Sequence, residues 1–338
     1  MPLTSRIGAN LIIKKISRVK LTVDCEVTSQ LSALPQTSAL GYLLSKANTA
    51  WLDVPLEALV CNQYGLKPAQ DYPIAAVAAS ADGLEIGDAF WLRADPVHLT
   101  MQRDSFSLSE PLPIQVEHEH AKRIVASLNQ HFNAEGLTFF IGNSGAWYLR
   151  LNQVPQIKTS LPSVAIGKNS YQFMPQGDMS AKWRAYLNEA QMLLFSHPVN
   201  AARELAGAPV INSLWLSGGG MMPLRATPYH DFDLMVANSP FYLGLAQWSG
   251  LPSQVMAMPL DDVIHGAASR QHVHLQLTRE QSLDDASFQV LLNALKIKKI
   301  KALNLNLGCY EKTLVLTMTS LGNYKFWRKL KPVMHFLA

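Results

Sequence analysis

The chain is poor in cysteine and in charged residues, and it has no long apolar run. Its 338 residues include three cysteines, Cys25, Cys61 and Cys309, which lie far apart in the sequence. This number and spacing exclude a disulfide scaffold and a CxxC metal site, and they favour a reducing compartment. No run of about 18 apolar residues occurs, so the sequence predicts no membrane-spanning helix and no membrane partner. The apolar residues 11–13 are too few for a signal-peptide core, and we expect a cytoplasmic protein.

The low charge content also limits the classes of partner. Charged residues make up 16% and hydrophobic residues 48% of the chain, a balance typical of a globular protein and not of a disordered one. The net charge of +4 is mild, and we do not expect a nucleic-acid partner. One basic run, 296–301, is interpreted as a helix end before a strand. The other, 325–331, also contains aromatic residues, and binding of an acidic protein partner stays open beside a plain surface role.

The order of helical and strand-like patterns predicts an α/β protein with a mixed, largely parallel sheet flanked by helices. Residues 74–79 fit either a strand or a helix, and Asp95-Pro96 is expected to form a turn after a strand. The proline- and glycine-rich passage divides the chain into an α/β region 1–155, a connection 156–179 and an α/β region 180–338. We expect strands within 11–23, 90–93, 147–151, 254–258, 272–277, 301–307 and 313–318, and helices over 40–48, 56–64, 116–131, 180–196, 241–248 and 284–295.

The most informative pattern is in residues 197–220, HPVNAARELAGAPVINSLWLSGGG. Residues 214–216 predict a short buried strand, and a glycine run follows it directly. Such a run leaves backbone N–H groups free to approach a ligand. Asn200 and Arg203 are three residues apart and share a helix face, and arginine offers donors that suit a phosphate or a carboxylate. The pattern is neither a P-loop nor a GxGxxG fingerprint.

We therefore predict a pocket for a small anionic metabolite, phosphorylated or carboxylated. Arg93, Asp95 and His98 would line the same cleft, because they follow a strand end, where the ligands of α/β proteins bind. The alternative is structural: a flexible glycine connection, a surface arginine paired with Glu204, and a salt-bridged turn at residues 93–98. The candidate ligand-binding residues are His197, Asn200, Arg203, Asn212, Trp215, Gly218, Gly219, Gly220, Arg93, Asp95 and His98, with Trp215 as a packing support.

Metal-binding and nucleophilic patterns are weak. Asp261, Asp262 and His265 have the spacing of one helix face, but further ligands would have to come from distant residues such as His272 and His274. An acidic helix start explains the two aspartates equally well. The EHEH tract at 117–120 lacks the HExxH spacing, and the serine in GNSGA at 142–146 lacks the GxSxG spacing. No catalytic residue is identified, and we expect no metal.

Four segments, 87–99, 147–151, 187–194 and 197–220, together resemble a bacterial family labelled regulatory protein RpfE or phosphoglycerate mutase-like protein. The resemblance covers residues 30–330. Within it, the asparagine, arginine, tryptophan and glycine pattern of 200–220 is remotely similar to archaeal-type cofactor-independent phosphoglycerate mutases. This similarity implies a reduced alkaline-phosphatase-like fold and, for an active enzyme, two metal ions (Mn²⁺ or Mg²⁺) with a serine nucleophile.

The sequence departs from that pattern at two points. Asp82-Gly83 follows an alanine run and not the first strand, and Gly308-Cys309-Tyr310 stands where a carboxylate and a histidine would be needed. We therefore predict a catalytically degenerate, phosphomutase-like regulatory or ligand-binding protein without a cofactor. The alternatives are a metal-dependent phosphoryl-transfer enzyme of the phosphoglycerate mutase type, an isomerase or phosphatase, and a protein-interaction scaffold.

Overall fold

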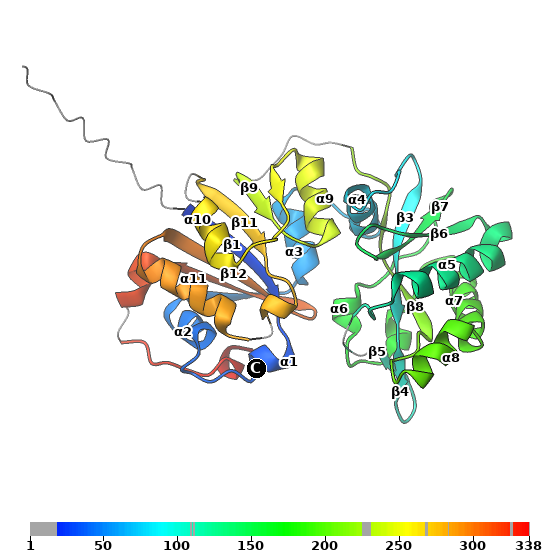
Figure 1. The fold of residues 1–338 in the computed structure, drawn as a ribbon, viewed down its shortest axis with the longest axis horizontal. Helices are drawn as coiled ribbons and strands as arrows, with labels where there is room; N and C mark the ends of the chain where they lie inside the picture. The colour runs from blue at the N-terminus through cyan, green and yellow to red at the C-terminus, as the bar shows by residue number, and fades with distance from the viewer. Residues whose placement is uncertain are drawn as a thin grey trace, which may run out of the picture.

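The computed structural model describes residues 19–108, 110, 112–224, 231–267, 270–282, 284–324 and 327–337. The chain folds into two lobes, each built on its own sheet (Figure 1). We call them the seven-stranded lobe and the four-stranded lobe. Among the described helices, none combines the length and the apolarity that crossing a bilayer requires.

The seven-stranded sheet has the strand order β10-β9-β11-β1-β12-β13-β2. The strands from β10 to β12 in this order are parallel, whereas β13 is antiparallel to both β12 and β2. This confirms the predicted mixed, largely parallel sheet. The strands are β1 (Val19–Glu26), β2 (Asn48–Leu52), β9 (Leu234–Val236), β10 (Ser253–Gln254), β11 (His272–Gln276), β12 (Ile300–Cys309) and β13 (Lys312–Thr319).

The two faces of this sheet differ in polarity. On one face, alternate residues of β1 and β12 such as Leu21, Val23 and Leu305 pack in an apolar core under the helices α2, α10 and α11. Because side chains alternate along a strand, the residues between them face the other side, toward α3 and α9. Thr22, Asp24 and their neighbours make that side polar. The helices of this lobe are α1 (Ser29–Ser32), α2 (Ala39–Lys46), α3 (Leu56–Gln63), α9 (Pro240–Ser249), α10 (Leu260–Gly266), α11 (Ala286–Lys296) and α12 (Met334–Leu337), with the 3₁₀ turns η4 (Glu280–Ser282) and η5 (Ser320–Tyr324).

The four-stranded sheet is antiparallel, in the order β6-β7-β3-β8. One face carries an apolar core beneath the amphipathic helices α5 and α7 and the short helix α8. A separate hairpin, β4-β5, packs near Trp215. The elements are β3 (Phe90–Val97), β4 (Leu99–Met101), β5 (Phe106–Leu108), α5 (His118–Phe132), η1 (Asn133–Glu135), β6 (Leu137–Ile141), β7 (Trp147–Leu151), α6 (Pro162–Ala165), η2 (Ser170–Phe173), α7 (Ser180–Phe195), α8 (Pro198–Leu205) and β8 (Ser213–Gly220).

The lobes share a packed junction made by α4 (Ile74–Ala81) and α9. The alanine-rich α4 is buried along its length, and its core also contains Trp91 of β3 and Tyr148 of β7. The two helices approach so closely that a Cβ at Gly244 would lie 2.0 Å from the carbonyl oxygen of Val77. The junction therefore depends on small residues and fixes one lobe against the other.

The structure resolves or corrects several expectations for individual elements. Residues 74–79 form a helix, α4. The turn predicted at Asp95-Pro96 was wrong, because β3 continues to Val97. Beyond Arg93 this strand pairs only with β8 and has left β7, so Pro96, which lacks an N–H, costs no ladder hydrogen bond on that edge. The strand expected over 254–258 is confined to β10. Residues 11–18 and part of the basic run 325–331 lie outside the described residues.

The sheets also divide the chain differently from the predicted regions 1–155, 156–179 and 180–338. The seven-stranded sheet combines β1 and β2 with β9 to β13, while the four-stranded sheet takes β3, β6, β7 and β8 from the middle of the chain. Residues 156–179 contain α6 and η2 and belong to the four-stranded lobe. Long-range strand pairing cannot be seen in local composition, which is why the passage indicated a boundary there.

Candidate functional site

A buried polar network lies under α3 and α9 on the seven-stranded sheet, and Asp24 of β1 is at its centre. The Asp24 side chain is 0% exposed. The Tyr242 hydroxyl donates to Oδ2 at 3.0 Å, Asn306 Nδ2 donates to Oδ1 at 2.7 Å, and His274 Nε2 lies 2.8 Å from Oδ2. Both carboxylate oxygens therefore accept hydrogen bonds, as a buried charge requires.

The network continues from His274 to Tyr64 of the α3 C-terminus, whose hydroxyl is 2.9 Å from Nδ1. With the imidazole proton on Nε2, the ring donates to Asp24 and accepts from Tyr64. Burial, followed by the nearby negative charge of Asp24, raises the pKa of both Tyr64 and Tyr242 above the ordinary range. The two phenols consequently remain protonated donors at physiological pH.

This network does not offer Asp24 as a ready ligand for Mn²⁺ or Mg²⁺, the ions that the family resemblance implies. Phenol, amide and imidazole donors occupy its two oxygens. A hard cation takes oxygen ligands and would have to displace these donors from a side chain that solvent does not reach. The donor set around Asp24 therefore fits hydrogen bonding and not metal binding.

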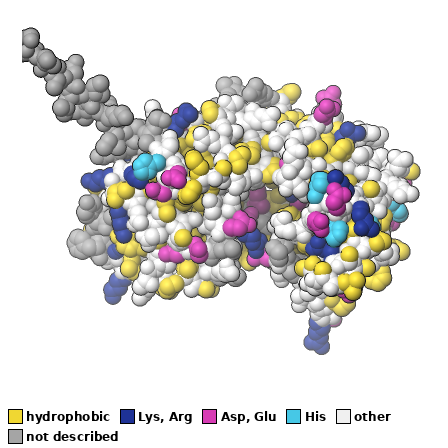
Figure 2. Space-filling view, viewed as in Figure 1, with side chains coloured by type: hydrophobic (Ala, Val, Ile, Leu, Met, Phe, Trp, Pro, Cys, Tyr) yellow, Lys and Arg dark blue, Asp and Glu magenta, His cyan; other side chains and the backbone are white. Residues whose placement is uncertain are grey.

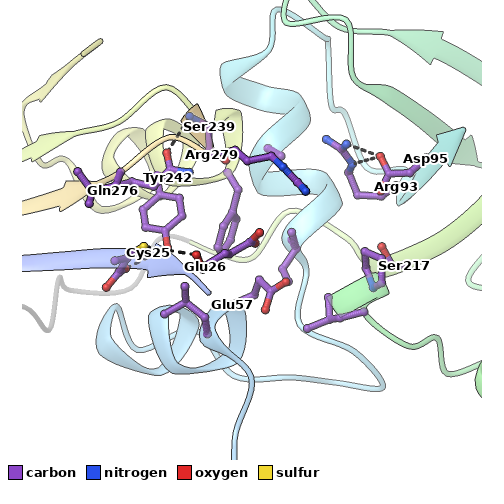
Figure 3. Close-up of a pocket in the computed structure, with 18 of the residues that line it drawn as sticks. Cys25, Glu26, Glu57, Arg93, Asp95, Ser217, Ser239, Tyr242, Gln276 and Arg279 are labelled. Atoms are coloured by element: carbon purple, nitrogen blue, oxygen red, sulfur yellow. Dashed lines mark hydrogen bonds and ion pairs between the residues drawn. The ribbon is translucent and has the colours of Figure 1, made fainter. Parts of the chain in front are cut away.

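Beside the network, a cavity of about 280 Å³ opens between the lobes, and Asp24 and Tyr242 form part of its wall (Figure 3). It lies at the carboxyl ends of the parallel strands β1 and β11, the edge at which α/β sheets bind ligands. The N-terminal turn of α9 borders it as well. The polar lining from the seven-stranded lobe includes Glu26, Glu57, Ser239, Gln276 and Arg279, and that from the four-stranded lobe includes Arg93, Asp95 and Ser217.

Two glutamates face each other across the seven-stranded side of the cavity. Burial in the cleft and then the negative charge of Glu57 raise the pKa of Glu26 to about 7, and the Arg279 guanidinium opposes this rise. Burial also raises the pKa of Glu57, against the Ser163 hydroxyl that donates to its Oε1 at 3.1 Å. The Glu26 side chain is still reached by the solvent of the cavity, so water screens part of this effect. Both carboxyl groups therefore have a pKa above the ordinary value of a glutamate.

The arginines of the cavity already have partners. Arg93 forms an ion pair with Asp95, with Nε 3.1 Å from Oδ1, and its guanidinium lies over the Tyr148 ring. Burial is the largest single influence and lowers the pKa of Arg93, but the charges and hydrogen bonds of Asp95 and Tyr148 together outweigh it and raise that pKa above its usual value. On the opposite wall, Arg279 lies 3.3 Å from a carboxylate oxygen of Glu110. Figure 3 shows Arg93 with Asp95 on one side of the cavity and Arg279 on the other.

The N-terminus of α9 adds a further polar group. Ser239 occupies the N-cap position, but its side chain makes no capping hydrogen bond. Its backbone N–H donates to Gln276 Oε1 at 3.1 Å. The hydroxyl is partly exposed and lines the cavity next to the first turn of the helix, where N–H groups and the helix dipole favour negative charge.

With this geometry in view, comparisons with known proteins add an architectural likeness. Neither protein-family models nor curated proteins give a match to the chain. Among solved structures it is similar to a cofactor-independent phosphoglycerate mutase from Thermoplasma acidophilum, with 18% identity, a TM-score of 0.41, and coverage of 89% of this chain and 90% of that one. It is also similar to the PH0037 protein from Pyrococcus horikoshii, with 13% identity, a TM-score of 0.48, and coverage of 90% and 88%.

Arg93 and Asp95 are the residues of the predicted ligand set that this cavity contains. Asn200 is 5% exposed, and its side chain makes hydrogen bonds to nearby backbone. Its amide nitrogen donates to the carbonyl oxygens of Leu194 and Ile211 at 2.8 and 2.7 Å, and its amide oxygen accepts from Ile211 N. Arg203 Nε donates to the carbonyl oxygen of Pro209 at 2.8 Å. These contacts hold the segment between α8 and β8, and ligand binding by Asn200 and Arg203 stays a prediction.

The remaining polar members of the set also contact the chain itself. Asn212 pairs through both amide atoms with the backbone of Leu99, at 2.7 and 2.9 Å. His98 Nδ1 is 2.9 Å from the carbonyl oxygen of Val210. His197 accepts from Val199 N as the N-cap of α8, and Trp215 donates to the carbonyl oxygen of Ser160. Trp215 belongs to the core under the β4-β5 hairpin, and its support of an anion pocket stays a prediction.

The glycine run lies inside β8 and not in a loop, which corrects the expected end of that strand. Gly218 has a φ of +63°, and a Cβ there would come within 2.9 Å of Ile74 Cβ. A Cβ on Gly220 would lie 2.5 Å from Pro73 Cβ. The run therefore lets the start of α4 lie directly on the sheet, which is a packing reason for glycine.

The weak metal candidates lie in two separate places, on the helix α10 and on the buried strand β11. Asp261 and His265 are exposed on α10, and Lys299 approaches both at 3.3 and 3.0 Å. Asp262 lies in the first turn of the same helix, in accord with an acidic helix start. His272 is bound to Thr22, and burial, helped by the charge of Lys20, lowers its pKa to about 4. Within the described part of the chain, no three His, Cys, Asp or Glu side chains are grouped as metal ligands.

Proposed function

We propose that this protein binds a small anionic metabolite in the cavity between its lobes, as a regulatory or ligand-binding protein of phosphomutase-like fold. The observation that carries this proposal is the position of the cavity. It lies where β1 and β11 end and where α9 begins, so strand ends and a helix N-terminus border one space. Both features favour the binding of negative groups such as phosphate or carboxylate.

The walls of the cavity suit a metabolite of modest size. About 280 Å³ is at the lower limit of ligand cavities, which hold roughly 300 Å³ or more. A three-carbon or sugar phosphate fits this space better than a nucleotide. Arg279 on one wall is partly exposed and supplies a guanidinium that suits an anionic group.

Binding without turnover is supported by the arrangement of Asp24. Phosphoryl transfer needs a nucleophile and a concentration of positive charge beside it. Asp24, a carboxylate near the end of β1, is instead enclosed by Tyr242, His274 and Asn306. These partners make it a rigid structural element of the cavity wall.

The test is a thermal-shift and turnover measurement on the full chain with 3-phosphoglycerate, glucose 6-phosphate and AMP, each with and without Mn²⁺. A ligand at a hundredfold excess over its Kd adds about 2.7 kcal/mol to the free energy of unfolding. We expect an upward shift of the melting temperature with a bound compound and no turnover of that compound. It should weaken in Arg279→Gln and persist in Arg103→Gln, which changes an exposed arginine of the β4-β5 hairpin.

Two results would contradict this function. Mn²⁺-dependent conversion of a phosphate ester would assign the chain to the phosphoryl-transfer enzymes. Absence of a shift with every compound would remove the anionic metabolite and favour a protein partner.

A further inference from the structure

Some charged side chains around the cavity have an ion-pair partner, and others do not. Arg93 is paired with Asp95, and Arg279 with Glu110. Within the described residues Glu26 and Glu57, in contrast, form no ion pair: the Arg279 charge acts on Glu26 from a distance, and Glu57 accepts from a backbone N–H and the neutral Ser163 hydroxyl. A purely anionic ligand would add negative charge to this side of the cavity, where Glu26 and Glu57 line both the main cavity and a small pocket beside it.

A second, independent observation comes from the opposite wall. Ser217 of β8 lines the same cavity and is 2% exposed. Its hydroxyl makes no hydrogen bond to any part of the chain that the structure describes. Among the described residues, the buried side-chain atoms without a partner are Gln63 Oε1 and Arg184 Nε, so the Ser217 hydroxyl is reached by the solvent of the cavity and is available to a ligand there. Ser217 lies on the side of Arg93 and Asp95, across from the glutamates (Figure 3), so polar groups without an ion-pair or hydroxyl partner line the cavity from both lobes.

We propose that the ligand carries a protonated amine beside its anionic group, and that Glu26 and Glu57 bind the amine. This inference rests on the proposed function, since it specifies the class of metabolite that the cavity takes: an amino acid phosphate, an amino sugar phosphate or an amino dicarboxylate. The anionic group lies toward Arg279 and the N-terminus of α9, and Ser217 completes the polar contacts from the four-stranded lobe.

The physical reason is charge balance at close range. An ammonium group has three N–H donors and no acceptor, so it can donate to both carboxylates at once. Placed between them, it replaces their repulsion by two charge-assisted hydrogen bonds. A hydroxyl at the same position is neutral and leaves the repulsion in place. Figure 2 shows acidic side chains in the notch between the lobes, where such a group would enter.

The experiment compares compounds that differ only in the amine. Isothermal titration calorimetry at pH 8, with EDTA present, measures O-phosphoserine against 3-phosphoglycerate and glucosamine 6-phosphate against glucose 6-phosphate. We expect the amine member of at least one pair to bind tenfold or more tightly than its hydroxyl partner. That preference should fall at least fivefold in Glu26→Gln and in Glu57→Gln, and persist in Glu204→Gln, which changes an exposed glutamate of α8.

A pH series separates a charge effect from a steric one. The groups facing Glu26 are Glu57, Arg279 and Glu110. Because the pKa of Glu26 is raised to about 7, this carboxyl gains negative charge between pH 6 and pH 8, while the α-amine of O-phosphoserine stays protonated. The preference for O-phosphoserine over 3-phosphoglycerate, in which the titration of the shared phosphate cancels, should rise over this interval in the parent chain and stay nearly flat in Glu26→Gln.

Each other outcome overturns the inference. Equal or tighter binding of the hydroxyl compounds would leave the proposed function standing and remove the amine. Binding that requires added Mg²⁺ or Mn²⁺ in place of EDTA would assign the glutamates to a metal ion. No binding by any of the four compounds would overturn both proposals. Thermal melts of the unliganded variants show whether a lost preference reflects lost folding.

Discussion

Asp24 Oδ2 lies 2.8 Å from His274 Nε2, and neither side chain is exposed to solvent. The two residues come from adjacent parallel strands and are 250 positions apart in sequence. Their contact is possible only when the two ends of the chain form one sheet. The pair therefore reports directly on whether the seven-stranded lobe is assembled.

We expect Asp24→Asn to destabilise the protein by about 2–4 kcal/mol, because it leaves buried donors without a charged acceptor. An asparagine also brings an amide N–H₂ toward the donors of Tyr242 or Asn306. Tyr242→Phe removes a single donor and should cost less, about 1–2 kcal/mol. Urea unfolding monitored by circular dichroism measures both. If Asp24→Asn unfolds at the same urea concentration as the parent chain, the network contributes nothing to stability.

Asn200→Ala tests whether the segment from His197 to Gly220 has a structural role. The substitution leaves the carbonyl oxygens of Leu194 and Ile211 and the Ile211 N–H without their partner. We expect a loss of about 2–3 kcal/mol in the free energy of unfolding. Asn188→Ala on the exposed face of α7 is the control and should change stability by no more than about 0.5 kcal/mol.

Ligand titration of the same variant separates the two interpretations of Asn200. The contacts of this side chain predict that the Kd for a metabolite bound in the cavity stays within twofold of the parent value. A large rise in Kd without a loss of stability would instead place Asn200 in a binding site.

Much of the fold could be predicted because local patterns are strong in this chain. The alternation of Leu303, Leu305 and Leu307 with polar residues predicted β12, and the amphipathic pattern before Phe132 predicted α5. The candidate site was harder. Asp24 is a single carboxylate in an apolar strand, and its partners come from positions 64, 242, 274 and 306. Polar residues two apart in β1, β11 and β12 are the signal that could have revealed the network.

The glycine run shows that a clear local pattern can also predict the wrong role. Glycines after a buried strand favour a ligand loop when only the sequence is known, yet here they accommodate Ile74 and Pro73 at the start of α4. A close approach between segments about 145 residues apart has no local signature. The same holds for Glu26 and Glu57, whose proximity follows from the packing of α3 against Gly308 of β12, the residue paired with Glu26, and from no motif.

Gly244→Ala should disrupt the junction between the lobes. A Cβ there would lie 2.0 Å from the Val77 carbonyl oxygen, which is backbone and cannot rotate away. We expect a loss of about 2–4 kcal/mol from overpacking, seen as a lower Tm and a lower urea midpoint. Gly266→Ala is the matched control, since a Cβ at that position meets no atom within 4 Å. Equal stability of Gly244→Ala and the parent chain would show that α4 and α9 separate easily.

The pH dependence of stability follows from the direction of the Glu26 shift. Its pKa is about 7 in the folded protein, above the ordinary value near 4.3. The folded state therefore binds more protons than the unfolded state between these values, and the free energy of unfolding falls as pH rises through this window. In Glu26→Gln, the plot of unfolding free energy against pH should become flatter between pH 4.5 and pH 7.5. In Glu204→Gln, the same plot should run parallel to that of the parent chain. Because solvent reaches Glu26, the effect is smaller than a fully buried carboxyl would give. Urea unfolding at half-unit steps of pH measures it, and a parent curve that rises across the whole window would contradict the raised pKa.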